Sequence, residues 1–133
     1  MPVFRDEGFF ILLSQFQDPC HFLLCYLEDY KMDPARANPL LTFSAFDDFA
    51  TSKDITLVRA DIINQGLEDD EGYKVVKQLM DMYLNDDDYA TVHAFNKQPD
   101  SFDFDDFVSQ QNAKWKSDDD DNTTTTTTST TKE

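Results

Sequence analysis

The sequence predicts an α+β fold with a mainly antiparallel sheet of about five strands and two helices. Three observations support this prediction. Four runs with the composition of strands come first, separated by short polar breaks, and the clearest helical pattern follows them. Consecutive strands followed by helices are typical of α+β folds, whereas parallel sheets alternate strands with helices. The part of the chain with mixed composition, Met1–Lys116, is long enough for one domain with a single core.

The first two strands are expected at Phe9–Gln17 and Cys20–Tyr30, with the Asp18–Pro19 break between them. Both runs are rich in aromatic and aliphatic residues, and two such runs around a short break predict an antiparallel hairpin. Alternation is weak in the first run because both of its faces are apolar. A strand of that kind is covered on both sides.

Two further strands are expected after a polar connector. Leu40–Phe46 is apolar and is closed by Asp47–Asp48 and a turn at Thr51–Asp54, and Ile55–Ile62 alternates more regularly. Gly66 then breaks the chain.

The clearest helix is expected at Asp69–Tyr83, where apolar residues recur at spacings of three and four. The acidic residues at its start support a helix, because the positive end of the helix dipole stabilises negative charge there. Tyr89–Asn96 is expected to be the fifth strand. A second helix is expected to open near Pro99 and to run to about Gln111, with Ser101 or Asp100 as its cap.

The residues after Lys116 have a different composition. Ser117–Glu133 consists mainly of an aspartate run and a threonine tract. Such a segment has no apolar area to offset the entropy cost of ordering, so residues 117–133 are expected to be a disordered tail that is dispensable for folding.

The net charge of −16 limits the class of partner. A chain this acidic, without a basic stripe, repels phosphate backbones and anionic lipid surfaces, so we expect neither nucleic acid nor membrane as a partner. The longest apolar run, Phe9–Leu13, is far too short to span a bilayer, which predicts a soluble protein. A protein that exposes lysine and arginine is the expected kind of partner.

No pattern in the sequence predicts catalysis, a cofactor or a metal. The three glycines cannot build a phosphate-binding loop, and no histidine stands close in sequence to a candidate nucleophile. Cys20, His21 and Cys25 lack the paired spacing of a zinc site, and no acidic cluster fits a calcium loop. We therefore expect a protein that is not an enzyme, with no catalytic, cofactor or metal residue. His21 and His93 are interpreted as surface or half-buried strand residues.

The two cysteines are expected to be free thiols. Cys20 and Cys25 are separated by an odd number of residues on a predicted strand, so their side chains point to opposite faces and cannot pair with each other.

Two groups of phenylalanines allow two interpretations. Burial against the sheet is the default, and exposure as a partner surface is the alternative. One group, with a neighbouring valine, opens the last helix, and the other lies around Asp47–Asp48. The residues are Phe102, Phe104, Phe107 and Val108 in the first group, and Phe43, Phe46 and Phe49 in the second.

The small number of predicted helices also favours a partner protein. Several predicted strands are apolar on both faces, yet only two helices are expected to cover the sheet. A second face would have to be covered by curling of the sheet, by helices upstream of this sequence, or by a client protein.

Two segments carry a resemblance to a known family. Val3–Gln17 (VFRDEGFFILLSQFQ) joins a charged lead-in to an apolar strand, and Phe95–Val108 (FNKQPDSFDFDDFV) runs through Asn-x-x-Pro into a helix start rich in phenylalanine. In this order and at this separation, they resemble the C-terminal domain of the mitochondrial chaperones that assemble the catalytic head of ATP synthase. The resemblance is closest to the assembly factor 1 family and runs from Pro2 to Gln111.

The resemblance implies a chaperone that binds the unassembled ATP synthase β subunit and prevents its self-association. It also implies a mitochondrial location, although no transit peptide is visible because Met1–Pro2 leads directly into Asp6 and Glu7. We expect a monomer whose partner-binding residues are unknown. The alternative is a small cytosolic α+β adaptor, unrelated to ATP synthase, that binds a peptide at a sheet edge or a helix groove.

Overall fold

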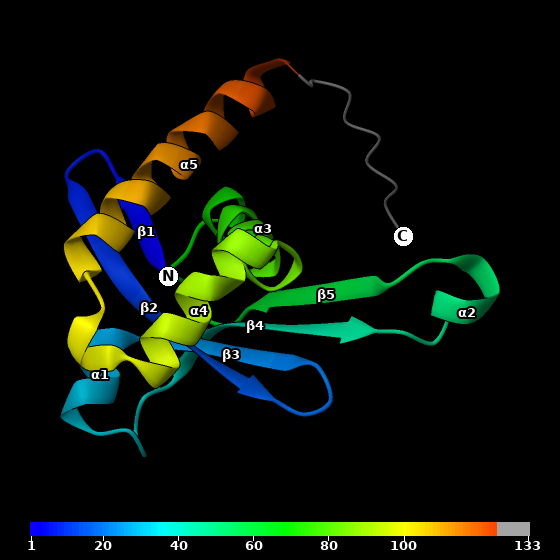
Figure 1. Cartoon of the computed structure of the whole chain (residues 1–133), viewed down its shortest axis with the longest axis horizontal. Coiled ribbons are helices and arrows are strands. Elements are labelled where there is room, and N and C mark those ends of the chain that lie inside the picture. The colour runs from blue at the N-terminus through cyan, green and yellow to red at the C-terminus, as the bar shows by residue number, and fades with distance from the viewer. Residues whose placement is uncertain (125–133) are drawn as a thin grey trace.

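The computed structural model describes residues 1–124 and has an α+β fold (Figure 1). Five strands form one antiparallel sheet, as expected, but the expectation of two helices is wrong, because the described residues form five α-helices and one 3-10 helix. The elements are β1 (Pro2–Arg5), β2 (Gly8–Gln17), β3 (His21–Tyr26), α1 (Leu27–Met32), β4 (Pro39–Phe46), α2 (Ala50–Lys53), β5 (Leu57–Ile62), α3 (Asp69–Leu84), α4 (Asp86–Lys97), η1 (Pro99–Ser101) and α5 (Phe104–Thr124).

The sheet has the order β1-β2-β3-β4-β5, so each strand pairs with its neighbour in the sequence. Such a meander needs only short connections. The hairpin of β2 and β3 was predicted, and Leu12 pairs with Tyr26 in it. The expected strand Cys20–Tyr30 is shorter in the structure, because the chain leaves the sheet after Tyr26 and forms α1.

β1 was not predicted. Its four residues pair with the start of β2 through a tight turn, in which Arg5 lies opposite Gly8. Gly8 has a φ of +145°, a backbone conformation that residues with a side chain rarely adopt. The charged sequence between Arg5 and Gly8 is therefore a hairpin turn, not a simple lead-in to one strand.

The expected strand Tyr89–Asn96 is wrong, because these residues belong to helix α4. Asn85 is the cause. Its side-chain oxygen accepts hydrogen bonds from the backbone N–H groups of Asp87 and Asp88, at 3.0 and 3.4 Å, and three aspartates occupy the first helical turn. An asparagine cap followed by acidic residues stabilises a helix start.

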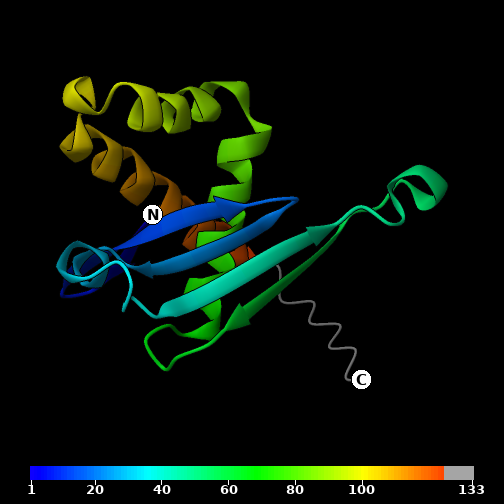
Figure 2. The ribbon, with the colours of Figure 1, turned by 90° about the horizontal axis from the view of Figure 1, so that it is seen from below.

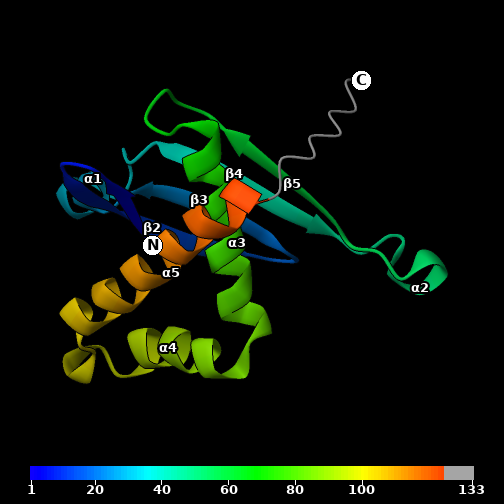
Figure 3. The ribbon, with the colours of Figure 1, turned by 90° about the horizontal axis from the view of Figure 1, so that it is seen from above.

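The last helix is longer than expected. α5 continues beyond Gln111 and Lys116 to Thr124, so the start of the segment expected to be a disordered tail is helical. The remainder of that segment, residues 125–133, lies outside the described residues. Figure 3 shows the far end of α5 close to α3. Asp118 lies 2.6 Å from Lys77, and Asp119 forms an ion pair with Lys74.

The core lies between one face of the sheet and helix α3. Leu12, Leu24 and Leu41 are almost completely buried on three neighbouring strands, and Val75 and Leu79 are buried on α3. Figure 2 shows α3, α4 and α5 on the same side of the sheet. Gly72 allows α3 to approach closely, because a Cβ atom there would lie 2.8 Å from Ile62 Cδ1.

Among the described residues, no helix combines the length and the apolar composition needed to cross a bilayer.

Candidate partner-binding groove

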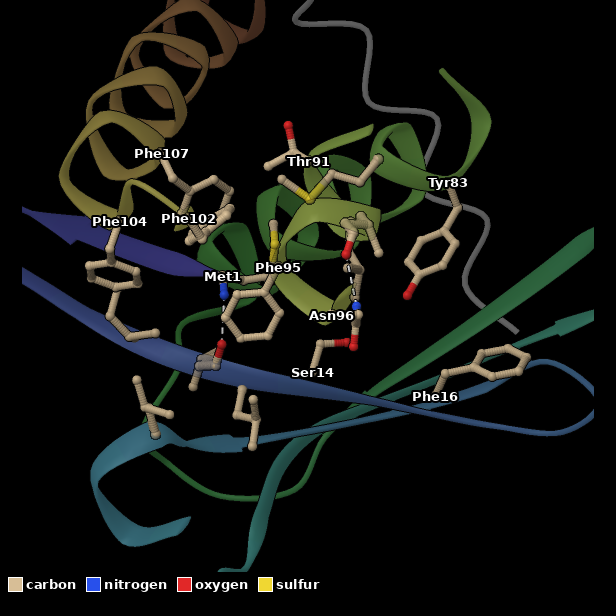
Figure 4. A pocket seen from close by; sticks show the side chains of 17 residues that line it. Met1, Ser14, Phe16, Tyr83, Thr91, Phe95, Asn96, Phe102, Phe104 and Phe107 are labelled. Carbon is tan, nitrogen blue, oxygen red and sulfur yellow. Dashed lines mark hydrogen bonds between the residues drawn. The ribbon is translucent and has the colours of Figure 1, made fainter. Parts of the chain in front are cut away.

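An apolar groove of about 200 Å³ lies between β2 and the layer formed by α3, α4 and the start of α5 (Figure 4). Its lining consists mainly of aliphatic and aromatic side chains. The residues are Met1, Ile11, Leu12, Leu13, Ser14, Phe16, Leu27, Leu79, Met82, Tyr83, Thr91, Val92, Phe95, Asn96, Phe102, Phe104 and Phe107.

The walls of the groove are aromatic and open to water. Phe16 is 50% exposed, Tyr83 41%, Phe95 48% and Phe104 40%. Its base is continuous with the core, because Leu12 is among the buried residues. Rigid aromatic side chains that remain exposed beside a buried apolar base are typical of a protein-binding surface.

The length of β1 leaves room for the groove. β1 pairs with β2 only from Gly8 to Ile11, and Met1 extends the pairing by one step. The backbone N–H of Leu12 donates to the Met1 carbonyl at 2.8 Å, and the amino group of Met1 donates to the Leu12 carbonyl at 2.6 Å. In the described part of the chain, no strand pairs with this edge of β2 beyond Leu12.

Helix α4 supplies one wall because of its spacing. Thr91, Val92, Phe95 and Asn96 recur at intervals that place them on one helical face. Asn96 also donates its side-chain N–H to the Val92 carbonyl at 2.8 Å.

A chain of ring contacts connects this wall to α5. Phe95 meets Phe102 edge to face, with the ring centroids 5.4 Å apart. Phe102 meets Phe107 at 5.6 Å, and Phe107 meets Phe104 at 6.3 Å. Offset and edge-to-face ring pairs of this kind stabilise one another beyond the area that they bury.

The base and the rim of the groove differ in charge. Burial lowers the pKa of the Met1 amino group to about 5, so the base is neutral at pH 7. Residues 85–107, which supply the helical wall, contain seven aspartates and one lysine. One of these acids, Asp88, is paired with Lys114 at 2.7 Å. The groove is therefore apolar inside, and the segment that supplies its helical wall is strongly acidic.

Of the phenylalanines for which burial and exposure were both considered, some are buried and others are exposed or line the groove. Phe43 is buried in the core, as the default required. Phe102, Phe104 and Phe107 line the groove, and Val108 is half-buried beside it. Phe46 and Phe49 are each 41% exposed, on the hairpin formed by β4 and β5.

The histidines and cysteines lie apart from the groove lining. His21 is half-buried on β3, with Nδ1 2.6 Å from Ser44 Oγ, whereas His93 is exposed and lies on α4 instead of a strand. Cys20 and Cys25 are both free, and burial raises the pKa of the Cys25 thiol. Residues 1–124 contain no group of three or more acidic, histidine or cysteine side chains placed to hold a metal ion.

Sequence reasoning did not identify Phe16, Tyr83 and Phe95 as groove residues. The sequence pattern predicts a strand at Phe95, and in a strand Phe95 and Val92 would not share a face as they do on α4. The signal that could have found it is the capping pattern of Asn85 and the aspartates that follow, which marks a helix start directly after α3.

Comparison with known proteins identifies one family. The model of a family described as ATP11 protein matches residues 1–108, which include strands β1 to β5 and the groove. No curated protein matches the chain.

Proposed function

Because the chain belongs to the ATP11 protein family, a family of ATP synthase assembly factors, we propose that it is a chaperone that binds the unassembled β subunit. The family gives the chain a general role in the assembly of this complex. The alternative of an adaptor unrelated to ATP synthase has no support from this membership. By analogy with the family, we propose a mitochondrial location.

The observation that carries the proposal is the groove with its exposed aromatic walls. Phe16, Tyr83, Phe95 and Phe104 come from four different elements and border one opening. An assembly chaperone must cover an apolar subunit interface of its client until the correct neighbour replaces it. A groove with an apolar base and aromatic walls matches the usual centre of a protein interface.

The aspartates of α4 and α5 are proposed to guide the client to the groove. Charges at the border of an interface speed and orient the encounter more than they strengthen the final complex. The aspartates of α4 and α5 would attract lysines or arginines beside the apolar patch of the client. Binding of this kind requires no nucleotide, and the proposed chaperone is not an enzyme.

Recovery of the β subunit with a tagged copy tests the proposal. We expect the wild-type chain to retain β subunit, and the Phe95→Asp variant to lose most of this binding because it places a charge in the groove. Tyr73→Asp is the matched control. Tyr73 is a 71% exposed aromatic residue on α3 and does not line the groove, so this variant should bind as the wild type does.

The outcome distinguishes the parts of the proposal. Equal binding by the wild type and the Phe95→Asp variant would remove the groove from the client site. Absence of β subunit from the wild-type sample would contradict the choice of client.

A further inference from the structure

The outer edge of β5 is open. β5 is the last strand of the sheet, and five of its six residues are exposed. Leu57 is 49% exposed, Val58 38%, and Ile63 directly after the strand 52%. Figure 3 shows β5 as the border of the sheet, with no described helix or strand outside it. A strand edge without a neighbour and without proline is a template for pairing with another strand.

The register with β4 determines which backbone groups point outward. The N–H of Ile63 donates to the Leu40 carbonyl at 2.8 Å, and Asp61 and Arg59 follow opposite Thr42 and Ser44. In an antiparallel pair the hydrogen-bonded positions alternate. The backbone groups of Arg59 and Asp61 therefore point toward β4, and those of Val58, Ala60 and Ile62 point toward the open edge.

We propose that a second copy of this chain occupies the open edge, with the two β5 strands antiparallel about a two-fold axis at Ala60. Ala60 then faces Ala60 of the second copy, and Val58 faces Ile62. These are the outward-pointing positions, so both pairs exchange backbone hydrogen bonds. A two-fold interface requires a surface that complements itself, and this strand has one.

The charges select this register. Arg59 and Asp61 lie on the same face of β5, with Arg59 Nε 3.0 Å from Asp61 Oδ2. Pairing about Ala60 places Arg59 of each copy opposite Asp61 of the other. A shift by two residues in one direction would place Arg59 opposite Arg59, and a shift in the other direction would place Asp61 opposite Asp61. Like charges directly opposite each other destabilise a strand pair.

The hairpin of β4 and β5 enlarges the contact. It projects from the body of the protein and ends in α2 (Figure 1). In the proposed arrangement Leu57 lies opposite Ile63 of the second copy, so the hairpin of one copy runs along the body of the other. Exposed apolar side chains at its end, such as Phe49 and Ile55, then approach that body.

This surface is distinct from the groove. The groove borders β2 near β1, at the opposite edge of the sheet from β5. Two copies joined through β5 would both keep the groove open, so the pairing can fail without any consequence for the proposed client site. We expected a monomer from the sequence, which does not reveal that β5 is an edge strand.

Sedimentation equilibrium of the full chain over a range of concentrations tests the proposal. We expect the average mass to rise from one chain toward two. Arg59→Asp alone and Asp61→Arg alone each create two like-charge pairs and should raise the dissociation constant about tenfold or more. The double variant Arg59→Asp, Asp61→Arg restores opposite charges across the axis and should return the dissociation constant close to the wild-type value.

Amide hydrogen exchange supplies a second measurement. Protection of the Val58, Ala60 and Ile62 amides should increase with protein concentration, whereas the Arg59 and Asp61 amides, already bonded to β4, should not change. Thermal unfolding of each variant checks that the exposed substitutions leave the fold intact. A single-chain mass at every concentration up to the millimolar range would overturn the proposal. A double variant no tighter than the single variants would overturn it equally, because Arg59 and Asp61 would then not face each other across the axis.

Discussion

Arg5 on β1 and Glu71 in the first turn of α3 form a two-pronged ion pair. Arg5 Nε and Nη2 each lie 2.8 Å from a different oxygen of the Glu71 carboxylate. Nη2 also donates to the Gly66 carbonyl at 3.0 Å. Glu71 in turn accepts the backbone N–H of Glu68 at 2.9 Å, within a capping box. One carboxylate therefore joins the first strand, the loop before α3 and the start of that helix.

The first prediction concerns the stability that this pair provides. Arg5→Ala leaves a largely buried carboxylate without its main partner, so we expect a loss of about 1–2 kcal/mol in the free energy of unfolding at pH 7. Arg36→Ala is the control, because Arg36 is exposed and its ion pair within residues 1–124 is with the nearby Asp33. Chemical denaturation should show almost no change for the control variant.

The same pair predicts a pH dependence. The hydrogen bond from Arg5 lowers the pKa of Glu71 in the folded protein. A carboxyl group with a lowered pKa contributes stability above its unfolded pKa, and the contribution is lost as the pH falls through the folded pKa. The stability difference between the wild type and Arg5→Ala should thus be full at pH 7 and shrink below about pH 4. A difference that stayed constant down to pH 2 would contradict this account.

The second prediction concerns the centre of the sheet. Leu12 and Leu24 are completely buried on adjacent strands. Leu12→Asp or Leu24→Asp would bury a charge without a partner, which costs several kcal/mol and should prevent folding. Circular dichroism should show no cooperative melting for either variant. Cooperative melting of Leu12→Asp would mean that water reaches the base of the groove.

The sequence predicted the strands of the hairpin and the first long helix, because their signals are local. The apolar run that became β2 lies between clear breaks, and α3 has a strong helical spacing after an acidic start. The predicted bounds of β2 and α3 agree with the structure to within one residue at each end, whereas β3 ends four residues earlier than expected. The antiparallel arrangement followed from the order of these elements alone.

The sequence could not predict features that depend on distant contacts. β1 has only four residues and no periodic pattern, and its position is explained by pairing with β2 and by the contact of Arg5 with Glu71, which lies 66 residues away. α4 was mistaken for a strand because aromatic and β-branched residues favoured that interpretation, while the cap at Asn85 was overlooked. The groove could not be predicted for the same reasons, since α4 supplies one of its walls and the short β1 leaves β2 unpaired along the groove.

The third prediction concerns the end of α5. From the sequence we expected the segment after Lys116 to be dispensable for folding. In the structure, Asp118 pairs with Lys77, and Asp119 pairs with the largely buried Lys74, which also lies 4.7 Å from the centre of the Trp115 ring. The hydrogen bond that Lys77 donates to Asp118 raises the pKa of Lys77.

A chain that ends at Lys116 should therefore lose about 1 kcal/mol of stability relative to a chain that ends at Thr124. The double variant Asp118→Asn, Asp119→Asn should reproduce most of this loss in the full chain. Urea denaturation of the two truncated chains, the double variant and the wild-type full chain measures it, and high salt should reduce the difference because the pairs are partly exposed. Equal stability of the two truncated chains would show that these ion pairs contribute nothing to folding.

The last prediction concerns the activity itself. We expect the protein to suppress aggregation of refolding ATP synthase β subunit at a near-equal molar ratio and without added ATP. The stoichiometric ratio follows from one groove covering one client surface, and the sequence contains no phosphate-binding loop for a nucleotide-driven cycle. Light scattering during dilution of the denatured subunit measures the effect.

Salt should weaken this protection without abolishing it. The aspartates of α4 and α5 attract the client through charge, and physiological salt screens this attraction at distances beyond about 8 Å. The apolar contact does not depend on charge and remains. Phe95→Asp should lose protection at every salt concentration, and Tyr73→Asp should keep it. Equal protection of an unrelated aggregating protein would reduce the activity to a general solubilising effect of an acidic chain, and the groove would then have no specific client.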